Sequence, residues 1–308
     1  MDADKEAYFN VLLRERLELC RRVITEEHDE DEFAMSWSGG KDSCVMSTLI
    51  DMAIPGNKIP RVYADTGLDL TIMRQFVDSQ MEKDSRIVKI APTVNIRKML
   101  EIDGYPFSSK KHAAIVSAYQ RLGYENSNQV RRYLGEHEDG RKWTSRFSCP
   151  KCLRYQFTEE FTKKLKVSDK CCVRMKEEPL DKWLKENGYK YHIIGLMAEE
   201  GGRRTNVTCF AFRSGQFKAF QPLAPLSKEW EDWFIEKYNI EICDVYKPPY
   251  NNQRTGCKGC PFSKHLQEEL DALKEYFPAD YRQCEKLWEP VYAEYRRIGY
   301  RLKKGGRQ

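Results

Sequence analysis

The segment 36–43, with the sequence SWSGGKDS, constrains the fold more than any other part of the chain. It follows the apolar residues 33–35 and leads into the apolar-periodic segment 44–50, an order that predicts a strand, a glycine-rich turn and a helix. Gly39 and Gly40 allow the backbone to approach a ligand closely and to take φ values that other residues avoid. The N–H groups of such a turn and the positive end of the following helix dipole form an anion site. The segment therefore predicts binding of a phosphate, pyrophosphate or sulfate group.

The polar side chains of this turn suit the same ligand. Lys41 supplies a fixed cation, and Ser38 and Ser43 supply hydroxyl donors. The spacing differs from the Walker A loop and from the dinucleotide fingerprint G-x-G-x-x-G. The sequence SGGKDS instead resembles the PP-loop of the ATP pyrophosphatases, a superfamily that includes sulfonucleotide reductases, tRNA thiolases and amide-forming synthetases. An ordinary glycine turn in an α/β domain is the alternative.

Composition sets broad limits. The chain has 308 residues, of which 41% are hydrophobic and 32% charged, so it can bury a core and stay in solution. No run is long enough to span a membrane, and the polar N-terminus lacks the apolar region of a signal peptide. We therefore expect a cytoplasmic protein. Its net charge of +5 permits an anionic ligand without requiring nucleic acid.

The hydrophobic pattern predicts an α/β fold. Short apolar strands at 61–64 and 87–90 follow the first strand, with a helix through 72–77 between them, and 191–196 reads as a further central strand. This alternation favours a doubly wound, mainly parallel sheet, in which ligands bind beyond the carboxyl ends of the strands. Both SGGKDS and the segment 65–67 follow such strands.

Other elements are expected around this sheet, and the chain then divides into three parts. We predict a helix over 5–26 with one apolar side, polar helices over 94–135, a hairpin at 211–217, a helix capped by Ser227 and a helical end at 262–300. The residues expected on the apolar side of the first helix are Tyr8, Val11, Leu12, Leu19 and Val23. The expected domains are an N-terminal helix at 1–30, the main domain at 31–265 and a C-terminal helical extension at 266–308. The C-terminal part also bears cysteines.

Eleven cysteines are many for a cytoplasmic chain, and clustered cysteines there indicate metal or redox chemistry. Two CxxC pairs and one adjacent pair stand out: Cys149 with Cys152, Cys257 with Cys260, and Cys171 with Cys172. Four thiolates in two close pairs can bind zinc or an iron–sulfur cluster. Spacing alone favours the two CxxC pairs as one site. The remaining cysteines are expected to be small buried apolar residues: Cys20, Cys44, Cys209, Cys243 and Cys284.

A family resemblance favours the other quartet. The segment 171–180, CCVRMKEEPL, resembles the CC-x-x-R-K-x-x-P-L segment of adenylylsulfate (APS) reductases, although Met175 stands where a basic residue is expected. With the later CxxC pair, the pattern resembles the CC…CxxC motif that holds a [4Fe–4S] cluster in those enzymes. The resemblance implies that the cluster ligands are Cys171, Cys172, Cys257 and Cys260, with zinc as the alternative. Lys176 lies in register with the family lysine and would tune the cluster or reach a substrate anion.

Further segments resemble the same PAPS-reductase-like family, whose pattern covers roughly residues 33–265. The segment 65–67 resembles its DTG motif, so Asp65 would bind ribose or a metal ion near the nucleotide. The segment 195–204 resembles the part that presents a phosphate- or sulfate-binding arginine, here Arg203 or Arg204. Cys149 and Cys152 have no counterpart; a second metal site, a redox dithiol, a sulfur donor and a plain loop all remain open.

The chain departs from true APS and PAPS reductases at its C-terminus. Those enzymes carry a nucleophilic cysteine in a segment like E-C-G-L-H, whereas this chain ends RLKKGGRQ. Cys284 lies in an expected helix without the neighbouring glycine and histidine. We therefore expect attack on the α-phosphate of ATP, with Lys41 and Mg²⁺ stabilising the leaving pyrophosphate. Asp42 would orient the loop or hold Mg²⁺, with helix capping as its alternative role.

The expected function is an adenine-nucleotide-binding PP-loop enzyme that adenylates an acceptor in preparation for sulfur transfer. The first alternative is an APS or PAPS reductase that uses another cysteine. The second is a non-catalytic nucleotide-sensing subunit of a nucleic-acid modification or defence complex. The acceptor would be a nucleic acid or a small molecule, and a sulfur donor or complex protein would be a partner. Cationic and aromatic side chains occur together near position 143, as they do in nucleic-acid sites: Arg141, Lys142, Trp143 and Arg146. A solvated loop is nevertheless the favoured interpretation of this segment.

Overall fold

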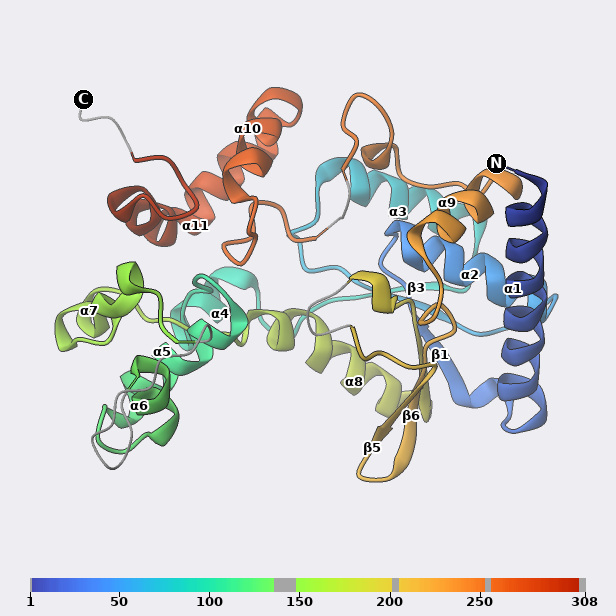
Figure 1. The fold of residues 1–308 in the computed structure, drawn as a ribbon, viewed down its shortest axis with the longest axis horizontal. Coiled ribbons are helices and arrows are strands. Elements are labelled where there is room, and N and C mark those ends of the chain that lie inside the picture. Colours follow the sequence, from blue (N-terminus) through green and yellow to red (C-terminus); the bar gives the residue numbers. More distant parts are fainter. Residues whose placement is uncertain (1, 136–147, 201–204, 253–255, 305–308) are drawn as a thin grey trace. The chain divides into compact units, whose positions relative to one another are not determined.

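The computed structural model describes residues 2–135, 148–200, 205–252 and 256–304, and its contacts divide the chain into two compact units (Figure 1). The sheet unit consists of Met1–Asp65, Thr71–Ala91 and Glu178–Thr255; the helical unit consists of Thr66–Leu70, Pro92–Glu177 and Gly256–Gln308. Arg203, Arg204 and the residues 141–146 lie outside the described residues. The domain limits expected at residues 30 and 265 stay predictions, because compact units and family domains need not share boundaries.

A six-stranded sheet forms the centre of the sheet unit, in the order β3-β2-β1-β4-β6-β5. The strands are β1 (Phe33–Ser36), β2 (Arg61–Ala64), β3 (Ile87–Ile90), β4 (Tyr191–Ile194), β5 (Phe210–Arg213) and β6 (Gln216–Phe220). All neighbouring pairs are parallel except β5 with β6, which form the expected hairpin around Ser214 and Gly215. This confirms the predicted α/β class with a mainly parallel sheet.

Helices cover both faces of the sheet, as a doubly wound fold requires. The helices of this unit are α1 (Ala3–Arg21), followed by a π-helical segment (Arg22–Glu26), α2 (Lys41–Ala53), α3 (Thr71–Lys83), α8 (Glu178–Glu186) and α9 (Lys228–Lys237). Alternate residues of β1 point to opposite faces. Phe33 and Met35 join the core formed with α1, α2, α3 and α9, whereas Ala34 packs with α8 through Leu184.

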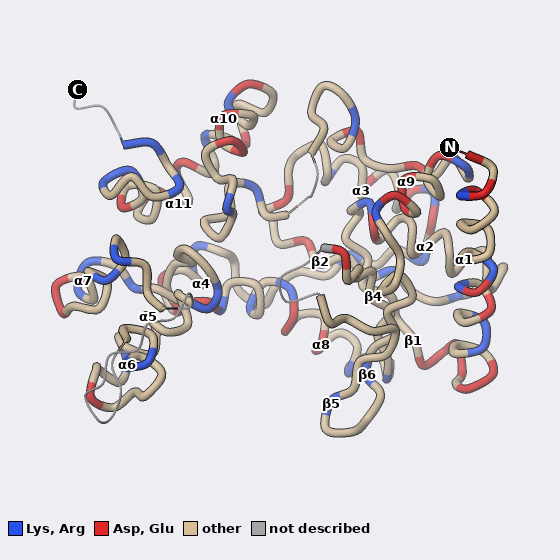
Figure 2. The backbone as a smooth tube through the Cα atoms, viewed as in Figure 1, with Lys and Arg blue, Asp and Glu red and all other residues tan. Residues whose placement is uncertain are grey.

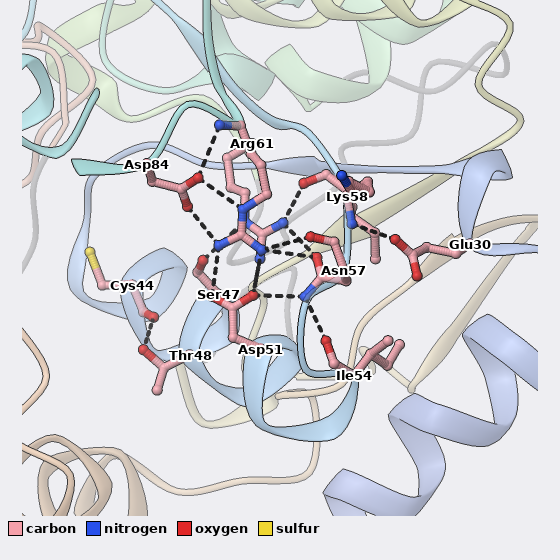
Figure 3. Close-up of polar contacts among 12 residues, drawn as sticks. Glu30, Cys44, Ser47, Thr48, Asp51, Ile54, Asn57, Lys58, Arg61 and Asp84 are labelled. Carbon is pink, nitrogen blue, oxygen red and sulfur yellow. Dashed lines mark hydrogen bonds and ion pairs between the residues drawn. The ribbon is translucent and has the colours of Figure 1, made fainter. Parts of the chain in front are cut away.

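A buried guanidinium ties the amino ends of β2 and β3 to the end of α2 (Figure 3). Arg61 has no exposed surface, and its nitrogens donate to Ser47 Oγ (3.2 Å), Asn57 Oδ1 (2.9 Å) and Asp51 Oδ1 (2.5 Å). Burial lowers the pKa of Arg61, and the neighbouring Asp51 carboxylate counters that shift. Because a buried charge needs a partner, this network fixes the sheet edge away from the carboxyl ends of the strands.

The first helix forms where the sequence predicts it, but two of the five residues expected on its apolar side do not face the core. Tyr8 and Val11 are exposed, whereas the helix buries Phe9, Leu13 and Cys20. Of the other expected residues, Val23 is buried in the π-helical segment, and Leu12 and Leu19 are partly buried against the core. The hydrophobic periodicity of this charged helix is weak. Contact with α2 and with Trp233 of α9 therefore decides which side is buried.

The helical unit contains α-helices from two separate stretches of the chain. They are α4 (Ile96–Asp103), α5 (Lys110–Leu122), α6 (Asn128–Leu134), α7 (Glu159–Lys164), α10 (Leu266–Tyr276) and α11 (Pro278–Ile298). A 3₁₀ helix (η3, Lys151–Gln156) and a π-helical segment (η4, Val173–Glu177) complete it. The predicted helical regions at 94–135 and 262–300 are thereby confirmed.

The smaller expectations have mixed outcomes. Ser227 caps α9 by accepting a hydrogen bond from the Trp230 N–H (3.1 Å), as predicted. Four of the five isolated cysteines are buried, but Cys209 is only half-buried, because it accepts a hydrogen bond from the Arg16 guanidinium (3.3 Å) at the edge of the core. Among the described residues, no helix combines the length and the apolar character that crossing a membrane requires.

Candidate functional site

The glycine-rich loop lies at the carboxyl end of β1, where the strand order reverses between β1 and β4. β2 and β3 lie on one side of β1 and β4 on the other, so a crevice for a ligand is expected here. The positive φ of Gly39 (+71°) and its approach to Val77 leave room only for glycine: a Cβ would lie 2.9 Å from Val77 Cγ2. Gly195, which follows β4, similarly allows close approach to the carbonyl of Asp42.

Hydrogen bonds within the loop hold it at the start of α2. Ser43 Oγ donates to the Gly40 carbonyl (2.8 Å), and the Gly40 N–H donates to Ser38 Oγ (3.2 Å). The Lys41 N–H donates to the Tyr246 hydroxyl (3.1 Å). Ser38 and Ser43 were expected to donate to a ligand, and here they also brace the turn. The amides of the N-cap Gly40 and of Lys41, the first residue of α2, therefore point to oxygen atoms, the geometry that a phosphate oxygen would use.

Charged residues of α9 meet the loop and form a compact network with it. Lys41 Nζ donates to Asp232 Oδ1 (2.8 Å) and lies 3.3 Å from Glu231 Oε2. Lys228 Nζ donates to Asp42 Oδ1 (2.7 Å) and Glu231 Oε2 (3.0 Å). Figure 2 marks both acidic and basic positions on α9. Three carboxyl groups thus face two ammonium groups beside the loop.

The electrostatics of this network centre on Glu231, whose side chain is fully buried. Burial and the Asp42 carboxylate together raise the pKa of Glu231 to about 7, against the opposing charges of Lys228 and Lys41. Burial also acts to raise the pKa of Asp42, but contacts with Glu231 and Lys228 outweigh it and leave that pKa lowered. Two carboxylates cannot donate to each other, so their contact becomes a hydrogen bond only when one holds a proton.

Burial acts to lower the pKa of Lys41, but the carboxylates of Asp232 and Glu231 outweigh it and raise that pKa. Lys41 therefore keeps its positive charge. In this arrangement it is paired with carboxylates of α9, and a phosphate would have to take their place. The sequence did not predict four of these residues as part of the site: Lys228, Glu231, Asp232 and Tyr246.

Asp65 lies where the sequence predicts it, at the carboxyl end of β2, the strand beside β1. Its N–H donates to the Ile90 carbonyl (2.8 Å), and its carboxylate lies 3.9 Å from the Arg74 guanidinium. Parallel strands place this carboxylate and the glycine-rich loop at the same edge of the sheet. The roles expected of Arg203 and Arg204 fall outside the described residues.

The second predicted quartet of thiols lies in the helical unit: Cys171, Cys172, Cys257 and Cys260. Burial raises the pKa of Cys171, and Cys257, Cys172 and Cys260 each raise it further. Burial likewise raises the pKa of Cys260 to about 12, with Cys257 and Cys172 adding to the effect. All four are free thiols. The four side chains therefore form one electrostatic group.

Lys176 lies with these thiols, as expected. The Cys257 thiolate is the largest influence on its pKa, which is raised. Burial raises the pKa of Cys257, and Lys176 and a hydrogen bond from Thr66 only partly oppose that rise. Thr66 and Asp69 also affect this group and were not predicted to do so. Thr66 belongs to the DTG segment. That motif could therefore have indicated a residue beside the cysteines as well as the position of Asp65.

The donor set fits an iron–sulfur cluster in its chemistry: four free thiols and a neighbouring cation in one unit. Among the described residues, no three His, Cys, Asp or Glu side chains are arranged to hold a single metal ion. A zinc ion needs its sulfur ligands within about 2.3 Å of one centre, whereas a [4Fe–4S] cluster gives each cysteine its own iron. Four thiols that influence one another without three lying around a single point are therefore compatible with a [4Fe–4S] cluster.

Residues of α11 hold the Cys257–Cys260 loop in shape. Gly259 has a positive φ (+57°), and a Cβ there would lie 2.5 Å from Tyr292 Oη. The Tyr292 hydroxyl donates to the Gly259 carbonyl, and the Trp288 indole donates to the Lys258 carbonyl (3.4 Å). Lys258 in turn donates to Asp280 Oδ1 (2.9 Å), and both side chains are buried.

Cys284 packs in the same place. Its sulfur would lie 2.9 Å from a Cβ at position 259, and burial raises the pKa of its thiol to about 12. A buried, protonated thiol is a poor nucleophile toward a substrate that arrives from solution. This agrees with the sequence argument that Cys284 does not replace the C-terminal catalytic cysteine of the reductases.

The fold and the phosphate-binding geometry of the loop define an α/β protein with a candidate nucleotide site. The family model of the phosphoadenosine phosphosulfate reductase domain matches residues 140–299, just over half of the chain. The chain therefore belongs to this PAPS reductase domain family. The matched range contains all six paired cysteines but not the glycine-rich loop, so the interpretation of residues 38–43 rests on the residues themselves. A comparison with curated proteins finds no match.

Several solved structures resemble the chain at a distance. PAPS reductase from Candida auris, in its phosphate complex, aligns with a TM-score of 0.46 and 11% identity over 83% of this chain and 96% of its own. FMN adenylyltransferase from Candida glabrata aligns at 0.43 and 12% identity over 78% of this chain and 60% of its own. The U34-tRNA thiolase NcsA from Methanococcus maripaludis, with its [4Fe-4S] cluster, aligns with a TM-score of 0.40 and 14% identity. The alignment covers 96% of this chain and 82% of the NcsA chain.

Proposed function

We propose that this chain is an enzyme that binds ATP at the glycine-rich loop and cleaves it between the α- and β-phosphates. Pyrophosphate leaves, and an acceptor becomes adenylated in preparation for sulfur transfer. The observation that carries the proposal is the loop itself: two glycines at the carboxyl end of β1, the amides of Gly40 and Lys41 directed at oxygen atoms, and the Lys41 side chain beside them. Membership of the PAPS reductase domain family supports an adenine nucleotide as the ligand.

The chain's own residues have distinct roles in this proposal. The amides of Gly40 and Lys41 exchange their internal hydrogen bonds for phosphate oxygens. The Lys41 ammonium leaves Glu231 and Asp232 and stabilises the charge that develops on the leaving pyrophosphate. Once the Lys41 ammonium has moved to the pyrophosphate, Asp42 has one cation fewer beside it. Its carboxylate then helps to hold Mg²⁺. Asp65 and, by resemblance, Arg203 or Arg204 bind ribose and phosphate.

The second part of the proposal concerns the cofactor. Cys171, Cys172, Cys257 and Cys260 would hold a [4Fe–4S] cluster, with zinc as the alternative. When bound, a cluster supplies electron transfer or a site for a sulfur-containing ligand. Lys176 sets the positive potential beside the thiolates and offers a contact for a substrate anion.

Two other functions are compatible with the same residues. A sulfonucleotide reductase would release sulfite from APS or PAPS. The burial of Cys284 counts against that cysteine as its nucleophile. A nucleotide-sensing subunit of a nucleic-acid modification or defence complex would bind nucleotide without turnover. We keep a nucleic acid or small molecule as the acceptor, a sulfur donor or complex protein as partner, and the cytoplasm as the location.

The first experiment measures pyrophosphate release from ATP and Mg²⁺ by protein purified without oxygen. We expect Lys41→Ala to lower the rate by about a hundredfold or more, because it removes a preorganised charge at the developing anion. Lys83→Ala is the matched control, since Lys83 forms only an exposed ion pair with Glu241 (2.6 Å). Full turnover by Lys41→Ala would disprove the role given to Lys41.

If wild-type protein with its cluster releases no pyrophosphate, the proposal of ATP cleavage fails. Sulfite release from APS or PAPS would then identify the reductase. Nucleotide binding without any product would identify the sensing subunit.

A further inference from the structure

Cys149 and Cys152 are the paired cysteines that neither the phosphate loop nor the four-thiol group uses. They flank Pro150 and Lys151 at the start of η3 in the helical unit. Burial has the largest influence on the pKa of Cys149, and the next largest influences are the charges of Arg154 and Cys152. For Cys171 they are the three other thiols of its own quartet. The two sets of thiols therefore form separate electrostatic groups.

The backbone around the pair is anchored on both sides. The Cys149 N–H donates to the Tyr133 carbonyl at 2.8 Å, and the Leu153 N–H donates to the Pro150 carbonyl at 2.9 Å. Arg154 donates to the Leu134 carbonyl at the end of α6 (2.9 Å). These bonds close a tight turn over residues 149–153 and fix it on α6. The two cysteines are therefore held near each other by the structure as well as by their spacing.

A buried polar group extends this anchor. Gln156, at the end of η3, makes a 2.7 Å hydrogen bond through Oε1 to His112 Nε2, and the other ring nitrogen of His112 lies 2.9 Å from the Tyr133 hydroxyl. All three side chains are buried. Burial lowers the pKa of His112 to about 4, so the imidazole stays neutral and serves as a structural link. The turn is rigidly supported without help from either cysteine.

The two cysteines have opposite environments. Cys152 is exposed, whereas Cys149 is 5% exposed and directs its thiol at the Pro150 carbonyl (3.5 Å). Burial raises the pKa of Cys149 to about 12. An accessible thiol next to a shielded one is the arrangement of a dithiol exchange site: the first reacts with an outside disulfide, and the second resolves the product.

We propose that Cys149 and Cys152 form a thiol–disulfide exchange site that reacts with disulfides of small thiols or proteins. The Cys152 thiolate attacks one sulfur of the disulfide R–S–S–R, forms a mixed disulfide and releases one R–S⁻, which takes a proton from water. The Cys149 thiol then attacks the sulfur of Cys152, and its proton passes to the second leaving thiolate. The chain's dithiol is oxidised to a disulfide, and R–S–S–R is reduced to two R–SH. This inference does not depend on the proposed ATP chemistry.

The test equilibrates the full chain with mixtures of reduced glutathione and glutathione disulfide, and in a second arm with oxidised and reduced thioredoxin. Acid quenching, alkylation and trypsin digestion follow. Trypsin cuts after Arg146, Lys151 and Arg154, so an internal disulfide joins the peptides 147–151 and 152–154, a linked pair that mass spectrometry identifies. We expect this pair to appear and disappear with the ratio of the glutathione couple. Its formation only with thioredoxin would mean that the partner is a protein disulfide.

Variants separate the two roles. Cys149→Ser should accumulate a mixed disulfide at Cys152 at least about tenfold more than Cys152→Ser does at Cys149, because only the exposed thiol can be attacked from outside. Cys209→Ser, a change at an unpaired half-buried cysteine, is the matched control and should leave the linked peptides unchanged. Circular dichroism verifies that the variants are folded.

Two results would overturn the proposal. One is the absence of linked peptides at every ratio of both couples. The other is one zinc ion per chain that is lost in both Cys149→Ser and Cys152→Ser, which would make the pair part of a metal site.

Discussion

The phosphate loop and the Cys257–Cys260 loop are both tight turns that depend on a glycine at positive φ, but they are built differently. The phosphate loop is continuous in sequence from strand to helix, and Gly39 meets the side chains of α3. The cysteine loop has no regular element of its own; Gly259 meets Tyr292 and Cys284 of α11. The residues of the first loop are contiguous in sequence, although Tyr246 also bonds to it, whereas the second loop lies between no regular elements and is closed by residues of α11.

Gly259→Ala should have the largest effect, because it adds a Cβ 2.5 Å from Tyr292 Oη at a left-handed position. We expect a loss of about 4 kcal/mol in local stability from steric overlap and backbone strain together. Hydrogen exchange of α11 measures it, with α2 as an internal reference. Gly123→Ala is the matched control, since Gly123 shares the positive φ but has no atom within 4 Å of the added Cβ. Equal effects of the two substitutions would show that Tyr292 does not constrain the loop.

Asp280→Asn should come next, with a loss of about 3 kcal/mol, because it leaves the buried Lys258 ammonium without a counter-charge. The cysteine loop should then become more accessible, which alkylation of Cys257 and Cys260 measures. Glu241→Gln breaks the exposed pair with Lys83 and should cost less than about 1 kcal/mol. Unchanged thiol reactivity in Asp280→Asn would mean that α11 holds the loop through its aromatic residues alone.

Glu231→Gln tests the phosphate site through pH. The folded protein keeps a proton on Glu231 up to about pH 7, whereas an unfolded chain releases it near its ordinary value of 4.5. Wild-type stability should therefore fall as pH rises from 5 to 7, by about 2 kcal/mol, because the lowered pKa of Asp42 affects stability only at more acidic pH. Glutamine does not titrate, so the variant should show a flatter profile in thermal unfolding. Parallel profiles for both proteins would contradict the raised pKa.

Tyr246→Phe should have the smallest effect. It removes the oxygen that accepts the Lys41 N–H in this structure. One hydrogen bond of this kind contributes about 1 kcal/mol, so we expect a change of severalfold in nucleotide affinity, measured by calorimetry. Tyr238→Phe, at the end of α9, is the matched control and should leave affinity unchanged. An identical affinity for Tyr246→Phe and wild type would show that Tyr246 does not compete with the phosphate for this amide.

The sequence alone determined the α/β class and the positions of most strands, because short apolar runs between turn signals have few other ways to be buried. It also predicted a glycine-rich turn between a strand and a helix, where the structure has it, from glycines, a lysine and serines that are contiguous. The choice between the two cysteine quartets came from a family resemblance. In the structure, the quartet that the resemblance implied forms a single electrostatic group.

Only the tertiary structure decided which side of α1 is buried and which residues surround the two loops. Phe9 and Leu13 replaced Tyr8 and Val11 because packing against α2 and α9 outweighs a weak helical pattern. Glu231, Tyr246 and Tyr292 act on loops that lie far from them in sequence. Their contacts arise from the order of the strands and the docking of α11, and a burial-dependent property such as the pKa of Glu231 exists only once those surfaces meet.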